Sequence, residues 1–253
     1  MRITFLGTGT SQGVPVIACE CNVCNSDDVK DKRLRSSVLI EHNNMVLVID
    51  AGPDFRQQML RYNIKLLDAI ILTHEHKDHT GGLDDVRAYN YLQKKPMPIF
   101  CEKRVFMALK KEYYYVFEEK KYPGLPEFDI KIINEKNFYI KDNLILPIRL
   151  YHNFLPVLGF RIENFAYITD ANYISKEELK KLQNLDVLVI NALRKEKHIS
   201  HFSLNEALEV IEKVKPKKSY LTHISHLMGK HKDVSKELPD NVSLAYDGLK
   251  IIL

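Results

Sequence analysis

A short apolar run at residues 69–72 passes directly into a cluster of metal-binding side chains, and this feature constrains the chain more than any other. The sequence continues as Thr-His-Glu-His-Lys-Asp-His-Thr-Gly-Gly, so His74, His76, Asp78 and His79 fall within six residues. Residues two apart share one face of an extended segment, which lets the first two histidines reach one metal ion together. The two glycines permit the tight turn that a following helix would need.

Three histidines and an aspartate are poor material for a protein core. Each side chain would have to be solvated or hydrogen-bonded at the end of the strand to avoid a desolvation penalty. Imidazole and carboxylate groups at this spacing are, however, ordinary ligands of divalent metal ions. The cluster therefore predicts a metal site at the end of a buried strand rather than a chance arrangement.

Short runs rich in β-branched residues recur along the chain and predict strands. They occupy residues 2–6, 37–41, 45–49, 69–72, 130–133, 144–150, 158–163, 166–169, 187–190, 219–222 and 249–253. The stretches with helical spacing are residues 55–62, 84–92, 103–111, 176–182 and 204–214. Ser175 with Glu178, and Ser203 with Glu206, are typical of helix starts. Closely spaced hairpins with helices in both halves favour a mixed α/β sandwich over a doubly wound sheet, and we expect one domain over residues 1–253.

The overall composition indicates a globular protein that is neither exported nor embedded in a membrane. Apolar residues make up 45% of the 253, which is enough for a sizeable core. The 37 basic and 33 acidic residues are interleaved, so the net charge of +4 mildly favours anionic substrates and forms no basic tail. Residues 1–9 lack the apolar core of a secretory signal, and no apolar run approaches the ~20 residues needed to cross a bilayer. We expect a soluble, cytoplasmic protein.

Three of the four cysteines, Cys19, Cys21 and Cys24, are packed into one short segment. Such a group in a chain of this length is not the even disulfide framework of a small secreted domain. Clustered thiols in a reducing compartment suggest a metal site, and the alternative is that reduced cysteines pack under a loop. Cys101 stands alone in an expected strand and is typical of a core residue.

The pattern His74-x-His76-x-Asp78-His79 resembles the signature of the metallo-β-lactamase superfamily, whose fold is a four-layer αββα sandwich with mixed sheets. The resemblance extends over essentially the whole chain. In that superfamily a downstream histidine, an aspartate and a final histidine complete two adjacent metal sites. The candidates that follow expected strands here, in this order, are His152, Asp170 and His223.

The resemblance implies a pair of divalent metal ions, zinc or manganese, in the active site. The implied ligands are His74, His76 and His152 for one metal, Asp78, His79 and His223 for the other, and Asp170 between them. Asp50 matches the early aspartate of the superfamily, which supports the ligand loop without touching metal. Asp170 is a carboxylate where true β-lactamases generally have a cysteine or lack the bridge, so the resemblance argues against antibiotic hydrolysis.

A narrower resemblance involves the cysteine cluster. The pattern Cys19-x-Cys21-x-x-Cys24, together with His226 three residues after His223, is similar to the phosphoribosyl cyclic phosphate phosphodiesterases of the PhnP group. In that group such a set of three cysteines and a histidine binds a separate structural zinc, and these are the expected ligands of a closed tetrahedral site. The resemblance therefore implies a third metal ion, a structural zinc.

A second narrower resemblance involves the segment His198-x-x-His201-Phe-Ser. It resembles the histidine motif that supplies a proton donor in cyclic phosphodiesterases and, more distantly, in ribonuclease Z. His201 is the better match, whereas His198 is equally well explained as a solvent-exposed loop residue. His42 and His231 fit neither motif and are expected at the surface.

Together these resemblances imply a metal-dependent phosphodiesterase that cleaves a small ribosyl cyclic phosphodiester. A hydroxide held between the two metals would attack phosphorus, with Asp78 and Asp170 at the catalytic centre and His201 protonating the departing oxygen. The alternatives on the same fold are a ribonuclease Z-like tRNA 3′-processing nuclease and a thioester or lactone hydrolase. A non-catalytic metal or redox protein is a further hypothesis, against which the seven active-site ligands argue.

The partners and the oligomeric state are less constrained. A small phosphodiester is the expected substrate, and nucleic acid is less favoured because no long arm rich in Gly, Pro and basic residues is present to clamp tRNA. The sequence leaves the oligomeric state open, a homodimer included. The tyrosine-rich stretch at residues 110–128 is expected to form an irregular loop over the sheet rather than a lid that grips substrate.

Overall fold

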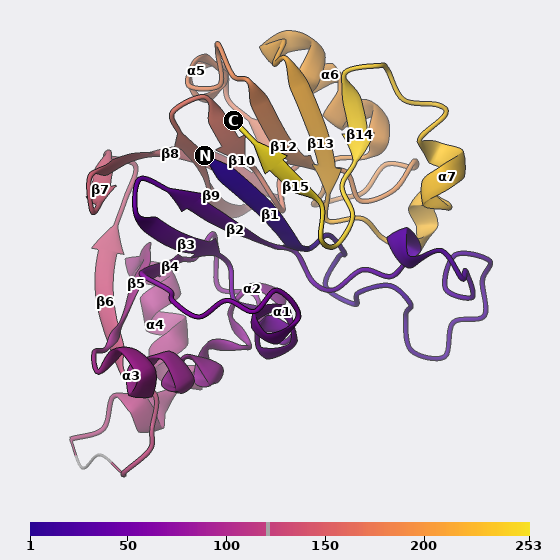
Figure 1. Cartoon of the computed structure of the whole chain (residues 1–253). Coiled ribbons are helices and arrows are strands. Elements are labelled where there is room, and N and C mark those ends of the chain that lie inside the picture. The colour runs from indigo at the N-terminus through magenta and orange to yellow at the C-terminus, as the bar shows by residue number, and fades with distance from the viewer. Residues whose placement is uncertain (120–121) are drawn as a thin grey trace.

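The computed structural model describes residues 1–119 and 122–253 and consists of two β-sheets that face each other between outer layers of helices (Figure 1). Three apolar cores account for the layers, one between the sheets and one between each sheet and its helices. This arrangement confirms the expected four-layer αββα sandwich with mixed sheets. Within the described residues, no helix is both long and apolar enough to cross a membrane.

The first sheet has seven strands and changes from antiparallel to parallel pairing along its width. Its order in space is β15 (Lys250–Ile252), β1 (Arg2–Gly7), β2 (Ser37–His42), β3 (Met45–Ile49), β4 (Ala69–Ile71), β5 (Met97–Glu102) and β6 (Phe128–Ile133). The strands from β15 to β3 pair antiparallel, whereas those from β3 to β6 pair parallel. Parallel strands point their carboxyl ends the same way, so the loops after β3 and β4 lie at one edge of the sheet.

The second sheet also changes from antiparallel to parallel pairing along its width. Its order is β11 (Tyr173–Ile174), β8 (Asn143–His152), β9 (Leu155–Ile162), β10 (Phe165–Tyr167), β12 (Val187–Asn191), β13 (Lys218–Thr222) and β14 (Val242–Leu244), with β7 (Phe138–Ile140) pairing β8 off that path. The strands from β10 to β14 run parallel. Because β8 and β10 are both antiparallel to β9, they too point the same way. The carboxyl ends of β8, β10 and β13 therefore lie at one edge.

Helices and short turns follow the strands of both sheets. The helices are α1 (Phe55–Arg61), α2 (Lys77–Thr80), α3 (Arg87–Gln93), α4 (Lys103–Glu112), α5 (Lys176–Lys180), α6 (Leu204–Val214) and α7 (His231–Val234). Short 3₁₀ turns occupy Val29–Asp31, Leu83–Val86, Tyr114–Val116 and His226–Met228. The start of α6 is fixed by a capping box, in which the Ser203 backbone N–H donates to the Glu206 carboxylate at 2.9 Å.

Successive side chains of a strand point to opposite faces of the sheet, which explains how each sheet buries both of its faces. In β3, Leu47 and Ile49 belong to the core between the sheets, whereas Val48 between them belongs to the core under the helices. Phe160 and Tyr167 of the second sheet are fully buried in the core between the sheets. Close packing on both faces holds the strand ends in fixed positions, and these ends carry the candidate site.

Most expected strands and helices are found in their places, but the ranges of four strands were not predicted, namely β5, β7, β11 and β14, although the strand expected at Cys101 is β5. The last three have only two or three residues, too few for an alternation pattern to stand out. In β5, Met97 and Pro98 interrupt the run of residues that favour strands, although Cys101 lies there and is fully buried. The helix expected at residues 84–92 is a 3₁₀ turn followed by α3.

The tyrosine-rich stretch at residues 110–128 includes residues 120–121, which lie outside the described part of the chain. Before them, the stretch continues α4 and forms a single 3₁₀ turn. Tyr113 is buried there and donates its hydroxyl hydrogen to the Thr80 carbonyl oxygen at 2.8 Å. This contact joins the end of α4 to the helical turn that carries Asp78 and His79.

His231 is buried, which contradicts the expectation of a surface residue. It begins α7 and is only 8% exposed; its Nδ1 atom lies 3.3 Å from Nη2 of Arg33, and its backbone N–H donates to Asp31 at 2.7 Å. The residue is buried because α7 packs against the segment that precedes β2. These two segments lie at opposite ends of the chain, so no local sequence pattern reveals the contact.

The buried His231 predicts a pH-dependent loss of stability. Burial, and then the nearby Arg33 and Lys30, lower its pKa from 6.5 to about 4. The unfolded chain takes up this proton at higher pH than the folded one, so His231 stabilises the fold fully above about pH 6.5 and progressively less down to about pH 4. We expect His231→Gln to flatten the pH dependence of the free energy of unfolding in this window, measured by urea unfolding. If the free energy of unfolding changed equally with pH in the variant and the wild type, the pH dependence would not arise from His231.

Candidate metal centre

Seven side chains from four separate segments converge at the carboxyl ends of strands. They come from the loop and short helix after β4, the end of β8, the turn after β10 and the turn after β13. They are His74, His76, Asp78, His79, His152, Asp170 and His223. The parallel course of these strands brings residues that are far apart in the sequence to one place.

A first group of ligand atoms gathers on one side of Asp170. Atoms of Asp78, His79, Asp170 and His223 all lie within 4.8 Å of one another. The His79 Nε2 atom lies 3.2 Å from Oδ2 of Asp78 and 3.1 Å from Oδ2 of Asp170. The His223 Nδ1 atom lies 3.1 Å from the same Asp170 oxygen. Four donors around one small space are the arrangement that a divalent metal ion requires.

A second group shares Asp170 with the first. Ligand atoms of His152, Asp170 and His201 also lie within 4.8 Å of one another. The ring centroid of His152 is 5.8 Å from that of His74 and 5.2 Å from that of His76. The structure therefore places one carboxylate between two sets of histidines, and it adds His201 to the side chains that surround this space.

The side chains fit metal ions because several buried nitrogen atoms around this space form no well-oriented hydrogen bond, even where a carboxylate oxygen lies 3.1 Å away. They are Nε2 of His74, Nε2 of His79, Nδ1 of His201 and Nδ1 of His223. Buried polar atoms in folded proteins are nearly always paired, so a group of unpaired nitrogens beside carboxylates requires an explanation. Imidazole and carboxylate ligands accept zinc, manganese or iron, and a pair of such ions would satisfy the nitrogen atoms of His74, His79 and His223.

The charge states of the site also suit metal binding. Burial lowers the pKa values of His74 and His223, which favours the neutral imidazole that binds metal. Burial acts to raise the pKa of Asp170, but His223 and His79 outweigh it and hold that pKa well below its usual range. Burial acts to lower the pKa of His79, but the carboxylates of Asp170 and Asp78 hold it well above its ordinary value. Metal binding would therefore release the His79 proton.

Asp50 lies behind the ligand loop, at the end of β3, and is fully buried. Its carboxylate accepts hydrogen bonds from the backbone N–H and the hydroxyl of Thr73, both at 2.9 Å. It also lies 2.7 Å from Nδ1 of His79. That contact leaves Nε2 of His79 facing the other carboxylates, which is the orientation that a metal ligand needs.

Two further polar groups hold the histidines, and neither was predicted from the sequence. Thr10, in the turn after β1, places its hydroxyl 3.2 Å from Nε2 of His223. The His152 ring donates from Nδ1 to the Ser200 carbonyl oxygen at 2.7 Å. The first has a weak signal in the Gly-Thr-Gly-Thr turn after an expected strand, whereas the second acts through its backbone and leaves no signature in the sequence.

The backbone is strained at three residues of the site. Asp50, Asp170 and His223 have positive φ angles of 65°, 53° and 55°. Residues other than glycine rarely adopt this conformation, and the packing around them must offset its cost. A glycine is required nearby, because a β-carbon on Gly52 would lie 2.0 Å from the carbonyl oxygen of Asp78.

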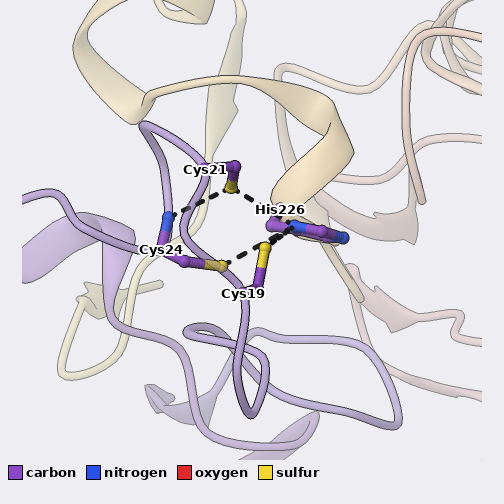
Figure 2. A group of neighbouring side chains, drawn as sticks. All are labelled: Cys19, Cys21, Cys24 and His226. Carbon is purple, nitrogen blue, oxygen red and sulfur yellow. Dashed lines mark hydrogen bonds between the residues drawn. The ribbon is translucent and has the colours of Figure 1, made fainter.

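A separate cluster joins the loop after β1 to the turn after β13 (Figure 2). The His226 Nδ1 atom lies 3.3 Å from Sγ of Cys19, 3.4 Å from Sγ of Cys21 and 3.6 Å from Sγ of Cys24. The backbone N–H of Cys24 lowers the pKa of Cys21 to about 6, whereas burial raises the pKa of Cys24 to about 11. Three sulfur atoms around one imidazole nitrogen have the composition of a closed tetrahedral zinc site.

A cavity of about 220 Å³ lies between the two clusters, lined by residues that include His201 on one side and His226 on the other. Its lining also includes Arg194, His198 and the hydroxyl-bearing Thr10, and among the described residues no Asp or Glu lines it. Guanidinium, imidazole and hydroxyl donors without a carboxylate favour an anionic or hydroxyl-rich ligand.

Several known proteins are similar to this chain in sequence. A family model described as a beta-lactamase superfamily domain matches residues 46–224. The chain is 38% identical over 256 residues to an octanoyltransferase of Porphyromonas gingivalis, covering 100% of this chain and 52% of that protein. It is 24% identical over 168 residues to a ribonuclease Z of Staphylococcus carnosus, covering 64% and 49%. The chain thus spans about half the length of these curated relatives.

Two solved structures have the same fold over the whole chain. One is the crystal structure of a new diphosphatase from the PhnP family, with 35% identity, a TM-score of 0.93, and coverage of 100% of this chain and 97% of that one. The other is the short form of human tRNase Z, with 18% identity, a TM-score of 0.71, and coverage of 100% and 99%. At its low identity, the second likeness shows the fold alone.

Proposed function

This chain belongs to the metallo-β-lactamase superfamily, and we propose that it is a metal-dependent hydrolase that cleaves small phosphodiesters at a pair of divalent metal ions. The observation that carries the proposal is the position of Asp170, which has Oδ2 beside His79 and His223 and Oδ1 toward His201. A carboxylate placed in this way can hold two cations next to each other, an arrangement that enzymes use to cleave phosphate esters. The likeness to a diphosphatase of the PhnP family supports phosphorus as the atom attacked.

The proposed ligands of the metal pair are the seven side chains at the strand ends. They are His74, His76, Asp78, His79, His152, Asp170 and His223. Two cations of zinc or manganese held there would supply an activated water and would neutralise the charge of a phosphate ester. The protein keeps most of the imidazoles neutral and the aspartates ionised, and holds Asp170 between the two sets of histidines.

His201 is proposed to protonate the departing oxygen of the substrate. The residue is 8% exposed, and its Nδ1 atom lies 3.7 Å from Oδ1 of Asp170 without a hydrogen-bond partner. Burial lowers the pKa of His201 to about 3, so the ring is neutral in the free protein. The negative charge of a bound phosphate beside the ring would favour its protonated form.

Replacing His201 by alanine should lower the turnover of a cyclic ribose phosphodiester by about a hundred- to ten-thousandfold, because the ribose oxygen needs a proton to leave. Turnover of bis(p-nitrophenyl) phosphate should fall much less, since nitrophenolate leaves without a proton. The metal content of the variant, measured on the same samples, should equal that of the wild type and of a His42→Ala control. Loss of metal, or an equal loss of turnover with both substrates, would contradict the role of proton donor.

The cavity beside His201 is proposed to hold the part of the substrate that is not cleaved. Its volume of about 220 Å³ is smaller than the pockets of about 300–1,000 Å³ that enclose drug-sized ligands. Arg194 and His198 in its lining can donate hydrogen bonds to sugar hydroxyls or to an anion. The size and polarity of the cavity favour a ribosyl group over a folded RNA.

A diphosphate linkage is the second candidate, because the neighbour with a TM-score of 0.93 is described as a diphosphatase. In a diphosphate esterified at both ends, the attacked phosphorus also carries two bridging oxygens and one negative charge, so the same metal pair would serve. A phosphate group leaves more readily than a ribose oxygen. Cleavage of a diphosphate should therefore depend little on His201, and the two candidates are distinguished by the His201→Ala variant.

The curated relatives leave two other activities to be tested. A ribonuclease Z activity would require this chain to bind tRNA, which the small cavity does not favour. The likeness to an octanoyltransferase suggests acyl transfer as another activity. This chain, however, spans only 52% of that protein, and the similarity does not show which part of it transfers the acyl group. A thioester substrate would not need His201 as a proton donor.

The cluster of three cysteines and a histidine is proposed to hold a structural zinc ion. The zinc would tie the loop after β1 to the turn after β13, since His226 belongs to the turn and the three cysteines to the loop. Thiolate ligands of this kind persist in a reducing compartment, which supports a cytoplasmic location. The ion would serve folding rather than chemistry, because four protein ligands leave no open position.

The proposed function is tested by a substrate panel with zinc-loaded and manganese-loaded protein. The panel contains 2′,3′-cyclic nucleotides, a ribosyl cyclic phosphate, a nucleoside diphosphate ester, precursor tRNA and an octanoyl thioester. We expect the highest kcat/KM for a cyclic phosphodiester and none after removal of metal with a chelator. Turnover confined to precursor tRNA or to the thioester would overturn the proposal.

A further inference from the structure

We propose that Arg104 is a positioning residue that locks the loop carrying His74 and His76 onto the β8–β9 hairpin that carries His152. These two segments belong to different sheets, and the metal site that the three histidines form needs them in register. The role rests on the proposed metal pair. Arg104 lies in the first turn of α4, outside the metal site. From there it would fix the ligands of one of the two proposed metal ions.

Glu75 stands between the two histidines of the loop and is the first partner of Arg104. Neighbouring residues in an extended segment point to opposite faces, so Glu75 faces away from the site when His74 and His76 face it. The Glu75 and Arg104 side chains form an ion pair and are only 21% and 33% exposed. Because both side chains are largely buried, solvent screens their charges less than it screens those of a surface ion pair. Fixing Glu75 thus fixes the side on which both histidines lie.

The same guanidinium also reaches the second sheet. Its Nη2 atom donates to the carbonyl oxygen of Pro156, in β9, at 2.5 Å. The neighbour of Pro156 in the hairpin is Leu155, and Leu155 is the residue that pairs with His152. Arg104 therefore holds a carboxylate beside two proposed metal ligands and a carbonyl beside the third.

A second arginine keeps Arg104 in place. Arg149, in β8, donates two hydrogen bonds to the Glu102 carboxylate, at 3.0 and 2.5 Å. Glu102 ends β5 directly before α4, and its Oε2 atom lies 3.9 Å from Nη2 of Arg104. Carboxylates thus flank the Arg104 guanidinium on two sides, which orients it between the loop and the hairpin.

The two halves of the proposed metal pair should differ in their dependence on Arg104. In the half formed by Asp78, His79 and His223, His79 is held by Asp50 and His223 by Thr10, neither of which contacts Arg104. The half formed by the other three histidines draws its ligands from the two segments that Arg104 joins. Loss of Arg104 should therefore weaken one active-site metal and spare the other.

The test is a titration of metal-free protein with Co(II), followed by its visible spectrum, in Arg104→Met, Arg104→Lys and Glu75→Gln. We expect Arg104→Met and Glu75→Gln to bind one active-site metal about ten- to a hundredfold more weakly than the wild type. The other active-site metal and the cysteine-bound metal should keep their wild-type affinities. Arg104→Lys keeps the charge and should recover part of the loss, and Lys103→Met, at the exposed neighbouring position, should bind like the wild type.

Wild-type affinity for both active-site metals in Arg104→Met, or equal weakening of all three metals, would overturn the positioning role. If Arg104→Met does not fold, as judged by urea unfolding, Glu75→Gln decides, because it keeps the size of the side chain. The titration uses no substrate, so a protein that shows selective weakening but hydrolyses no phosphodiester would refute the proposed function alone.

Discussion

Asp170→Asn should lower the turnover of the metal-loaded protein by about a thousandfold or more, through kcat rather than KM. The amide keeps the shape of the carboxylate but has no charge with which to hold two cations, one beside His79 and His223 and the other beside His152. A metal ion supplies several kcal/mol of transition-state stabilisation in reactions of this kind, and loss of one ion of the pair corresponds to a factor of this size. The measurement is kcat together with metal content by mass spectrometry.

The matched control for this variant is Asp240→Asn, which makes the same change at an exposed position before β14. It should alter neither turnover nor metal content. Asp170→Asn protein that retained two active-site metals and wild-type turnover would show that Asp170 does not hold the pair.

Asp50→Ala should destabilise the metal-free protein by about 3–5 kcal/mol and weaken metal binding by about ten- to a hundredfold. The carboxylate is fully buried and accepts hydrogen bonds from Thr73 and His79. Its removal leaves the Thr73 N–H unpaired and takes away one of the carboxylates that balance the His79 ring, whose pKa is raised. Urea unfolding measures the first effect, and Co(II) titration measures the second.

The control for Asp50→Ala is Asp129→Ala at the surface. Asp129 pairs with Lys131 at 3.0 Å, and both side chains are well exposed, so its removal should change the free energy of unfolding by less than about 1 kcal/mol. If Asp50→Ala lowered the free energy of unfolding by as little as Asp129→Ala does, the ligand loop would not depend on the Asp50 carboxylate.

The sequence reveals the metal motif because its evidence is local. His74, His76, Asp78 and His79 lie within six residues after an apolar strand, and this density of ligands has no good explanation in core packing. The more distant ligands, such as Asp170, follow apolar runs but have no local signature of their own. They were identified through the resemblance to a family, and the fold explains their convergence through the parallel course of β8, β10 and β13.

Other features of the site could not be predicted because they depend on contacts between sheets. Arg104 looks like an ordinary surface arginine of a helix, and only the position of α4 beside the ligand loop and the β8–β9 hairpin gives its side chain two partners beside metal ligands. His231 looks exposed because the segment that covers it lies about two hundred residues away in the chain. Ser200 holds His152 through its backbone, and a backbone contact is independent of residue type.

Anomalous diffraction from crystals grown with zinc or manganese tests the central claim most directly. Two cations around Asp170 should appear as two peaks about 3.5–4 Å apart, one beside His79 and His223 and the other beside His152. A third peak should lie among the three cysteines and His226 when zinc is present. A single peak near Asp170, or none, would contradict the account of a paired metal centre.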